Sequence, residues 1–335
     1  MSPEGAVPPA RPDRNLALEM VRVTEYAALA AARRVGQGDK IAADQAAVDA
    51  MRLMLDTVHM DGTVVIGEGE KDEAPMLYNG ERIGDGSSPE VDIAVDPLEG
   101  TDLAATGAPR ALAVIALSAR GTMFDPGPCV YMEKIATSPE FADLLDLDRP
   151  LAETLGLIAE RKGTGVEDVT VVMLDRPRHA EAVAAVREAG GRIRFIPHGD
   201  VSAGLIAATA GSPVDLLWGI GGTPEGVITA AAIKCLGGQL LGRMWPRDEG
   251  ERRAALDAGY DLEEIVDVDR LVSGDDVFFA ATGVTDGDLL DGVHYTATGA
   301  TTESLVTRTR SGTMRKIQAT HDRAKLREIT GSRAG

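Results

Sequence analysis

Carboxylates and a hydroxyl end an apolar run in the stretch VDIAVDPLEGTD, residues 91–102. Asp96 precedes a proline, and this pair suits the first two positions of a type I turn. Such a turn brings its first and fourth Cα atoms within about 7 Å, so the carboxylates of Asp96 and Glu99 can converge on one cation. The glycine that follows lets the chain double back, and we expect Thr101 to cap a helix whose free N–H groups bind an anion.

Two further segments place carboxylates after an apolar run. VVIGEGEKDEAP offers Glu68 between two glycines, followed by Asp72, and WGIGGTPEGVITAAAIK offers Glu225 in the first turn of an expected helix. Oxygen donors without His or Cys favour Mg²⁺ or Mn²⁺ over zinc, and paired cations clamp phosphoryl oxygens. The residue types therefore predict a metal-dependent phosphate-ester hydrolase.

Each of these three signals is weak when taken alone. An Asp-Pro-x-Glu sequence is usually a surface turn, and GEGEKDE is more often a solvated charged loop. GIGGTPEG could be a nucleotide loop, but it has neither the G-x-G-x-x-G spacing nor the Walker lysine. Because each of the three follows an apolar strand, and ligands of α/β sheets bind at the carboxyl ends of strands, together they favour one site.

The composition excludes several classes of function. The chain has 335 residues and a formal net charge of −19, which disfavours nucleic acids and anionic membranes as partners. Its two cysteines are too few for a disulfide framework and suit a reducing compartment. No run reaches the roughly 18 apolar residues of a membrane span, and the first residues contain no apolar signal segment. We therefore expect a cytoplasmic protein with a small-molecule partner.

Hydrophobic periodicity predicts the elements that must hold these residues. Two helices, over 14–36 and 42–58, are expected to open the chain. The strands expected next are 63–68, 91–95 and 111–117. Strands alternate with helices from residue 169 onward, which indicates a parallel or mixed sheet. Residues 132–150 are less regular and are expected to hold the crossing between two halves, and antiparallel strands are expected after residue 277.

The predicted organisation is a layered α/β fold with two sheets. A tail over 1–12 is expected to be disordered because it is rich in proline and small residues. Residues 13–150 form an N-terminal half with most of the acidic candidates, and residues 151–325 form a C-terminal α/β half that includes Glu225. Residues 326–335 form a second tail.

These motifs closely resemble those of the class II (GlpX-type) fructose-1,6-bisphosphatases. The matching segments are GDKIAADQAAVDAMR, VIGEGEKDEAPMLYNGE, VDPLEGT, YMEK, DRPRH, GIGGTPEG and ATGVTDGDLL, in family order from about residue 14 to about residue 320. DPLEGT is also similar to the Asp-Pro-hydrophobic-Asp-Gly-Thr signature of the lithium-sensitive phosphatases, which include inositol monophosphatases. Glu99 stands where that wider group has Asp. The resemblance implies the α/β/α/β/α sandwich of this sugar phosphatase superfamily.

The resemblance also implies an activity. The reaction would be hydrolysis of the 1-phosphate of D-fructose 1,6-bisphosphate to fructose 6-phosphate and phosphate, in gluconeogenesis and central carbon metabolism. Two cations per active site, Mn²⁺ or Mg²⁺, and a homo-oligomer, either dimer or tetramer, would accompany it. Sedoheptulose 1,7-bisphosphate stays open as an additional or main substrate, and a non-catalytic sugar-phosphate sensor is the alternative of another class. An inositol monophosphate is disfavoured because a monophosphate needs no distal pair of arginines.

Roles follow from the resemblance position by position. The implied metal ligands are Asp44 and Glu68 for one cation and Asp96, Glu99 and Glu225 for the other. The implied catalytic residues are Thr101, Glu68, Asp72 and Lys40. The implied substrate-binding residues are Glu99, Gly100, Thr101, Tyr131, Arg176, Pro177, Arg178, His198, Gly199, Asp200 and Gly222. Thr101 would orient or deprotonate the attacking water, and the arginines would hold the distal phosphate in bidentate contacts.

One position departs from the family pattern. The family usually carries Asp-Gly-Asp where this chain has His-Gly-Asp, residues 198–200. Two carboxylates would accept hydrogen bonds from sugar hydroxyls. His198 accepts one bond when it is neutral and donates from both ring nitrogens when it is charged. Substrate preference and pH response are therefore expected to depend on this histidine.

Overall fold

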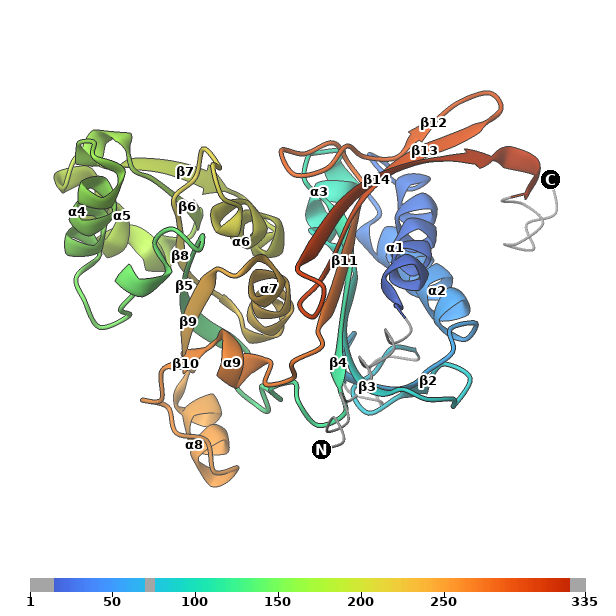
Figure 1. Ribbon diagram of the computed structural model, residues 1–335, viewed down its shortest axis with the longest axis horizontal. Helices are drawn as coiled ribbons and strands as arrows, with labels where there is room; N and C mark the ends of the chain where they lie inside the picture. The colour runs from blue at the N-terminus through green and yellow to red at the C-terminus, as the bar shows by residue number, and fades with distance from the viewer. Residues whose placement is uncertain (1–14, 70–75, 326–335) are drawn as a thin grey trace, which may run out of the picture.

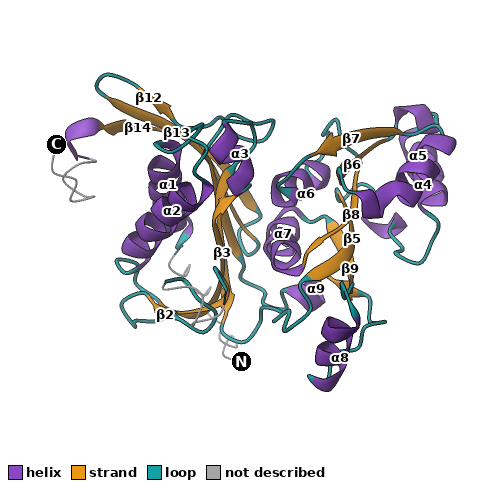
Figure 2. Cartoon of the chain, turned by 180° about the vertical axis from the view of Figure 1, so that it is seen from behind, coloured by secondary structure: helices purple, strands orange, loops and turns teal. Residues whose placement is uncertain are grey.

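The computed structural model describes residues 15–69 and 76–325, so Asp72 and both predicted tails lie outside the described residues. Its elements stack as helices, sheet, helices, sheet and helices (Figure 1). The first helical layer consists of α1 (Ala17–Ala32) and α2 (Lys40–Leu55). The middle layer consists of α6 (Asp200–Ala208) and α7 (Thr223–Leu236), and the third consists of α4 (Leu151–Lys162) and α5 (Ala180–Glu188). The predicted α/β/α/β/α architecture is confirmed, with α6 and α7 between the two sheets (Figure 2).

The first sheet is built from two separate parts of the chain. Its strands, in spatial order, are β12 (His294–Tyr295), β13 (Gly299–Arg308), β11 (Phe278–Gly283), β4 (Leu112–Ala119), β3 (Glu90–Glu99), β1 (Asp61–Ile66) and β2 (Arg82–Ile83), with β14 (Thr313–Asp322) also paired to β13. Strands β1 and β3 run parallel. The strands after residue 277 join antiparallel, as predicted. Helices cover both faces of this sheet, which is why β4 buries consecutive side chains instead of alternate ones.

The second sheet takes its strands from the middle of the chain. Their spatial order is β10 (Val266–Asp267), β9 (Gln239–Met244), β5 (Tyr131–Thr137), β8 (Leu216–Gly222), β6 (Thr170–Leu174) and β7 (Arg192–Ile196). Strand β6 pairs parallel with β7 and β8, whereas β5 pairs antiparallel with β8 and β9. The sheet is therefore mixed, as the alternation of strands and helices indicated.

One expectation for the second sheet is wrong, and one helix beside it was not predicted. Residues 132–150 are not irregular throughout, because β5 is an inner strand of the sheet. Glu133 and Lys134 interrupt its apolar run, and a pair of charges inside a strand hides the periodicity that sequence reasoning uses. Helix α4 was also not foreseen, although it buries Leu155 and Ile158 against this sheet.

The middle layer consists of two helices made largely of small and aliphatic residues. Almost every residue of α6 is buried, and α7 buries residues on all of its sides. A helix that is apolar all round suits a position between two sheets. The core around it contains side chains from both sheets, including Val114 of β4 and Leu217 of β8. One continuous hydrophobic core therefore joins the two sheets to the helices between them.

The chain passes from the first sheet to the second after β4 and returns before β11. The remaining helices are α3 (Thr101–Thr106), α8 (Glu249–Asp257) and α9 (Val268–Leu271). The division of function between the halves 13–150 and 151–325 stays a prediction. Within residues 15–69 and 76–325, no helix combines the length and the apolar character needed to cross a membrane.

Candidate active site

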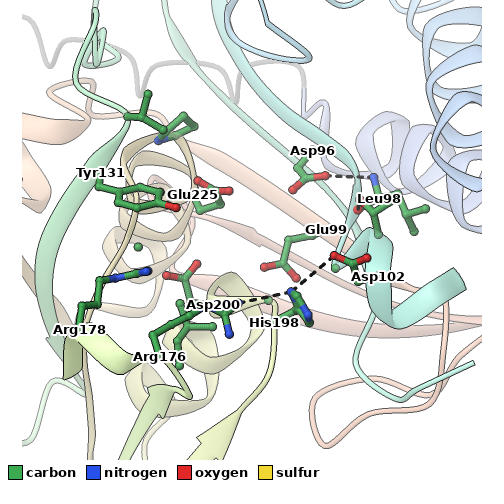
Figure 3. Close-up of a pocket in the computed structure, with 18 residues that line it drawn as sticks. Asp96, Leu98, Glu99, Asp102, Tyr131, Arg176, Arg178, His198, Asp200 and Glu225 are labelled. Carbon is green, nitrogen blue, oxygen red and sulfur yellow. Dashed lines mark hydrogen bonds and ion pairs between the residues drawn. The ribbon is translucent and has the colours of Figure 1, made fainter. Parts of the chain in front are cut away.

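The end of β3 forms the first wall of the site. The strand continues to Glu99 instead of turning at Asp96, and its pairing with β4 shifts register between these two residues. The predicted type I turn is therefore wrong, and an irregularity in the strand takes its place. The carboxylate of Asp96 accepts a hydrogen bond from the backbone N–H of Leu98 at 3.1 Å, which stabilises this irregular end (Figure 3).

Helix α3 follows at once and places Thr101 in its first turn. The helix cap is Gly100, with φ at 81°, so the predicted cap by Thr101 is wrong. The hydroxyl of Thr101 instead donates to the carbonyl of Leu98 at 3.1 Å. This bond uses the hydroxyl proton, so in this conformation Thr101 meets a water molecule as an acceptor.

Glu99 lies at the centre of the site with 2 % of its surface exposed. Its Oε1 accepts a hydrogen bond from the backbone N–H of Val201 at 3.2 Å, whereas Oε2 has no hydrogen-bond partner among the described residues. The backbone at Gly199 passes so close that a Cβ there would lie 2.8 Å from Oε2. A buried carboxylate oxygen without a partner is costly. The chemistry of this atom therefore favours a cation beside it.

The junction of β8 and α7 forms a second part of the acidic side. Glu225 lies in the first turn of α7, as predicted. A Cβ at Gly222 would lie 1.7 Å from Oε2 of Glu225, so the absence of a side chain there is what lets the carboxylate fold over the helix start.

Arg176 and Arg178 lie across the cleft from Asp96, beyond the end of β6 (Figure 3). Arg178 donates two hydrogen bonds to the carbonyl of Ile220, at 3.0 and 2.6 Å, and its guanidinium carbon lies 4.8 Å from the ring centroid of Tyr131. Nη2 of Arg176 lies 3.5 Å from Nδ1 of His198. These contacts hold both guanidinium groups beside the cleft.

The two sides enclose a cleft with a cavity volume of about 380 Å³. The candidates that line it are Asp96, Glu99, Gly100, Thr101, Tyr131, Arg176, Arg178, His198, Gly199, Asp200, Gly222 and Glu225. Lys40, Asp44, Glu68 and Pro177 do not line it. Asp44 and Glu68 nevertheless act on Asp96 through their charges. Pro177 begins the 3₁₀ turn that spaces the two arginines.

Burial raises the pKa of the acidic candidates. It raises that of Glu68 to about 7, with like-charge repulsion from Asp44, and that of Glu99 to about 8, with repulsion from Asp200. Burial also raises the pKa values of Asp44, Asp96 and Glu225. Carboxylates that are costly to ionise without a partner are suited to binding a cation, which favours the charged form.

This donor set consists of carboxylate oxygens, which fits a hard divalent cation. Within the described residues, however, no three acidic, His or Cys side chains stand close enough together to form a finished metal site. Like charges repel, so these carboxylates are expected to draw together only around a cation.

Sequence reasoning missed two residues of the site. Asp102 lies 3.6 Å from Nζ of Lys40 and 3.9 Å from Nδ1 of His198, so it links the two sides of the cleft. An acid in the first turn of a helix is too common to have identified it. Lys134 is buried and lies 2.7 Å from Asp200. Its position inside the YMEK motif was the available signal.

A five-layer α/β fold with buried carboxylates facing a pair of arginines defines a class, the metal-dependent sugar phosphatases. The family model described as "Bacterial fructose-1,6-bisphosphatase, glpX-encoded" matches residues 14–321. The chain therefore belongs to the glpX-encoded fructose-1,6-bisphosphatase family. Membership implies a hydrolase of carbohydrate metabolism that depends on divalent metal.

Curated relatives agree with the family match. The chain is 44% identical over 321 residues to "Fructose-1,6-bisphosphatase 1 class 2" of Escherichia coli (strain K12), covering 92% of this chain and 95% of that protein. The same identity and coverage hold for "Fructose-1,6-bisphosphatase class 2" of Shigella flexneri. A solved structure, extragenic suppressor protein suhB from Bartonella henselae, has a TM-score of 0.33 and 16% identity, covering 58% of this chain and 71% of that chain. The layered fold of this chain is defined by its own strand order.

Proposed function

We propose that this chain hydrolyses the 1-phosphate of D-fructose 1,6-bisphosphate to fructose 6-phosphate and phosphate. One observation carries the proposal: in a single cleft, Asp96 and the buried Glu99 lie across from Arg176 and Arg178. A bisphosphate needs both, because the phosphate being cleaved binds through cations and the distal phosphate binds through guanidinium groups. A cytoplasmic place in gluconeogenesis and a homo-oligomeric state belong to this proposal.

The acidic residues would act at the phosphate being cleaved. Asp44 and Glu68 would hold one divalent cation, and Asp96, Glu99 and Glu225 would hold another. A cation at these positions, Mn²⁺ or Mg²⁺, polarises a phosphoryl group and stabilises its developing negative charge. The buried, unpartnered Oε2 of Glu99 supports this assignment.

Thr101 would hold the attacking water in line with the phosphorus. Its hydroxyl proton is donated to the carbonyl of Leu98, so the oxygen offers a lone pair to that water. A neutral hydroxyl is a weak base, and this orientation supports a role in positioning more than in proton removal. Gly100 and Thr101 also lie at the start of α3, where backbone N–H groups lack helical partners.

The opposite side would bind the rest of the substrate. Arg176 and Arg178 would contact the distal phosphate, Tyr131 and Gly222 would flank the substrate, and Asp200 would accept hydrogen bonds from sugar hydroxyls. The charge of the arginine pair favours a bisphosphate over a monophosphate. Sedoheptulose 1,7-bisphosphate carries the same two end groups, so side-by-side kcat/KM values decide between the two sugars.

Phosphate release from fructose 1,6-bisphosphate tests the proposal. We expect turnover with Mn²⁺ or Mg²⁺, none after chelation, and a loss of at least about 100-fold in kcat for Glu68→Ala and Asp96→Ala. Thermal stabilisation by Mn²⁺ should weaken in both variants, which checks metal binding without turnover. Wild-type turnover in either purified variant would refute the metal assignment.

A matched control comes from the same strand. Asp92 of β3 is 2 % exposed, and its Oδ2 accepts hydrogen bonds from the backbone N–H groups of Thr122 and Met123 at 2.8 and 3.1 Å. Asp92→Ala removes a buried carboxylate without touching the cleft. We expect it to lower the free energy of unfolding while the folded protein keeps its metal-dependent turnover.

A further inference from the structure

Lys134 is the one lysine of the described chain that is fully buried, with 1% of its side chain exposed. It lies on β5, where its partners across the sheet are Gly219 of β8 and Gly242 of β9. Two other glycines leave room for the apolar stem, because a Cβ at Gly221 would lie 3.4 Å from Cε of Lys134 and one at Gly226 would lie 3.9 Å from its Cδ. A charge at such a place requires strong partners, because an unpaired buried ammonium is very costly.

Two contacts hold the ammonium group of Lys134. Nζ lies 2.7 Å from Oδ2 of Asp200 and donates a hydrogen bond to the carbonyl of Gly222 at 3.0 Å. Asp200 is the first residue of α6, and Gly222 directly precedes α7. One positive charge therefore joins an inner strand of the second sheet to the starts of both middle-layer helices.

Asp200 lines the cleft, whereas Lys134 does not. A side chain that cannot reach the substrate can still set the orientation of one that does. The backbone of Gly221 passes beside the same oxygen, since a Cβ there would lie 2.4 Å from Oδ2 of Asp200 and 3.4 Å from Nζ of Lys134. The orientation of Asp200 in the cleft thus depends on the ammonium group beneath it.

We propose that Lys134 is a positioning residue for substrate binding, which acts by holding Asp200 so that its outer oxygen accepts a hydrogen bond from a sugar hydroxyl. This inference rests on the proposed function, in which Asp200 contacts the sugar. Lys134 contacts neither phosphate nor cation in this role. Its effect should therefore fall on binding of the sugar more than on the chemical step.

The competing explanation is that the pair only stabilises the fold. The chain contains a second pair for comparison, because Nζ of Lys162, the last residue of α4, lies 2.7 Å from Oδ1 of Asp215, which directly precedes β8. Asp200 and Asp215 have equally buried side chains, each 7% exposed. Neither Lys162 nor Asp215 lines the active-site cleft. Lys162→Met therefore removes a lysine–aspartate pair with an equally buried carboxylate and a more exposed lysine, 24% against 1%, without disturbing the proposed site.

The test compares Lys134→Met, Asp200→Asn, the double variant and Lys162→Met. We expect Lys134→Met to raise KM for fructose 1,6-bisphosphate at least about tenfold, with a smaller change in kcat. The double variant should have the KM of Asp200→Asn alone, because Lys134 acts through that carboxylate. Lys162→Met should lower Tm and leave KM unchanged. Calorimetry should show the same pattern in the Kd for fructose 6-phosphate, which is not turned over: an increase in Lys134→Met and no change in Lys162→Met.

Three results would overturn the inference. One is a wild-type KM and product Kd in folded Lys134→Met, even with a lower Tm, since that marks a purely structural pair. Another is a double variant in which the fold-increases in KM of the two single variants multiply, since that marks independent roles. The third is a wild-type protein that binds no fructose 6-phosphate. A wild-type protein that binds fructose 6-phosphate but releases no phosphate from the bisphosphate contradicts the proposed function alone, and the calorimetric comparison then decides the role of Lys134.

Discussion

At the scale of single residues, His198 is the position where this chain differs from its family pattern. Its Nδ1 lies 3.9 Å from Oδ2 of Asp102 and 3.5 Å from Nη2 of Arg176. An aspartate there would face another carboxylate and compete with a phosphate for the arginine. We therefore expect His198→Asp to raise KM for fructose 1,6-bisphosphate by roughly three- to tenfold, about 0.7–1.4 kcal/mol. Steady-state kinetics between about pH 6 and pH 8 measure this.

Two comparisons isolate the cause of that change. The affinity for Mn²⁺, measured by thermal stabilisation, should stay at the wild-type value because His198 is not among the proposed metal ligands. Adding Asp102→Asn to His198→Asp should lower the KM for fructose 1,6-bisphosphate part of the way back to the wild-type value, because it removes the carboxylate that repels the new aspartate. Equal KM values for wild type and His198→Asp over the whole pH range would contradict the assignment.

At the scale of elements, the loop between β7 and α6 must pass Glu99 at close range. Gly199 has φ at 79°, and a Cβ there would lie 2.8 Å from Oε2 of Glu99. Gly199→Ala should cost about 1–2 kcal/mol of stability from the left-handed backbone and should also displace the carboxylate. We expect kcat/KM to fall at least about tenfold. Chemical denaturation and phosphate release measure the two effects separately.

Gly190, which lies between α5 and β7, provides the matched control for Gly199. It has φ at 89°, but no atom lies within 4 Å of a Cβ built there. Gly190→Ala should therefore lose a similar amount of stability and keep the wild-type kcat/KM. If Gly199→Ala also kept the wild-type kcat/KM, the close approach of Gly199 to Glu99 would not be needed for activity.

The elements also show how far the sequence could predict this site. Strands such as β7 and helices such as α2 were found because their apolar spacing is regular and belongs to one element. Residue type and spacing also identified Asp96, Glu99 and Glu225, whereas the arginines of the cleft came from the family resemblance. Sequence reasoning could not find β5, whose charges meet partners only in the folded protein. It also misjudged residues 96–99, because pairing with β4 overrides the local preference for a turn.

At the scale of the whole molecule, the two sheets are joined by more than the middle helices. Asp288, in the loop between β11 and β12, accepts hydrogen bonds from Arg110, at 2.8 Å, and from Arg194 of β7. Arg110 and Asp288 belong to the side of the first sheet, whereas Arg194 belongs to the second. This charged bridge lies at the sheet edge from which the chain enters the His-Gly-Asp loop. It therefore ties the layers together beside the cleft.

The bridge predicts a loss of stability in acid. Hydrogen bonds from Arg194, and then from Arg110, lower the pKa of Asp288 from 3.8 to about 2. The folded state thus binds this proton more weakly than the unfolded state, so the contribution is complete above about pH 4 and disappears as the pH falls towards 2. Asp288→Asn should cost about 1 kcal/mol or less at neutral pH, because the side chains are partly exposed. The difference from wild type should shrink in acid.

Urea denaturation of wild type and Asp288→Asn at a series of pH values from 7 down to 3 measures this prediction. Asp168→Asn is the control, because its pair with Arg192, at 3.3 Å, is more exposed and joins neighbouring strand ends within one sheet. We expect the control to change stability by less than about 0.5 kcal/mol. A constant difference between wild type and Asp288→Asn at every pH would show that the carboxylate charge does not join the sheets. A difference that closes as the pH falls would show that the ionised carboxylate of Asp288 stabilises the folded state.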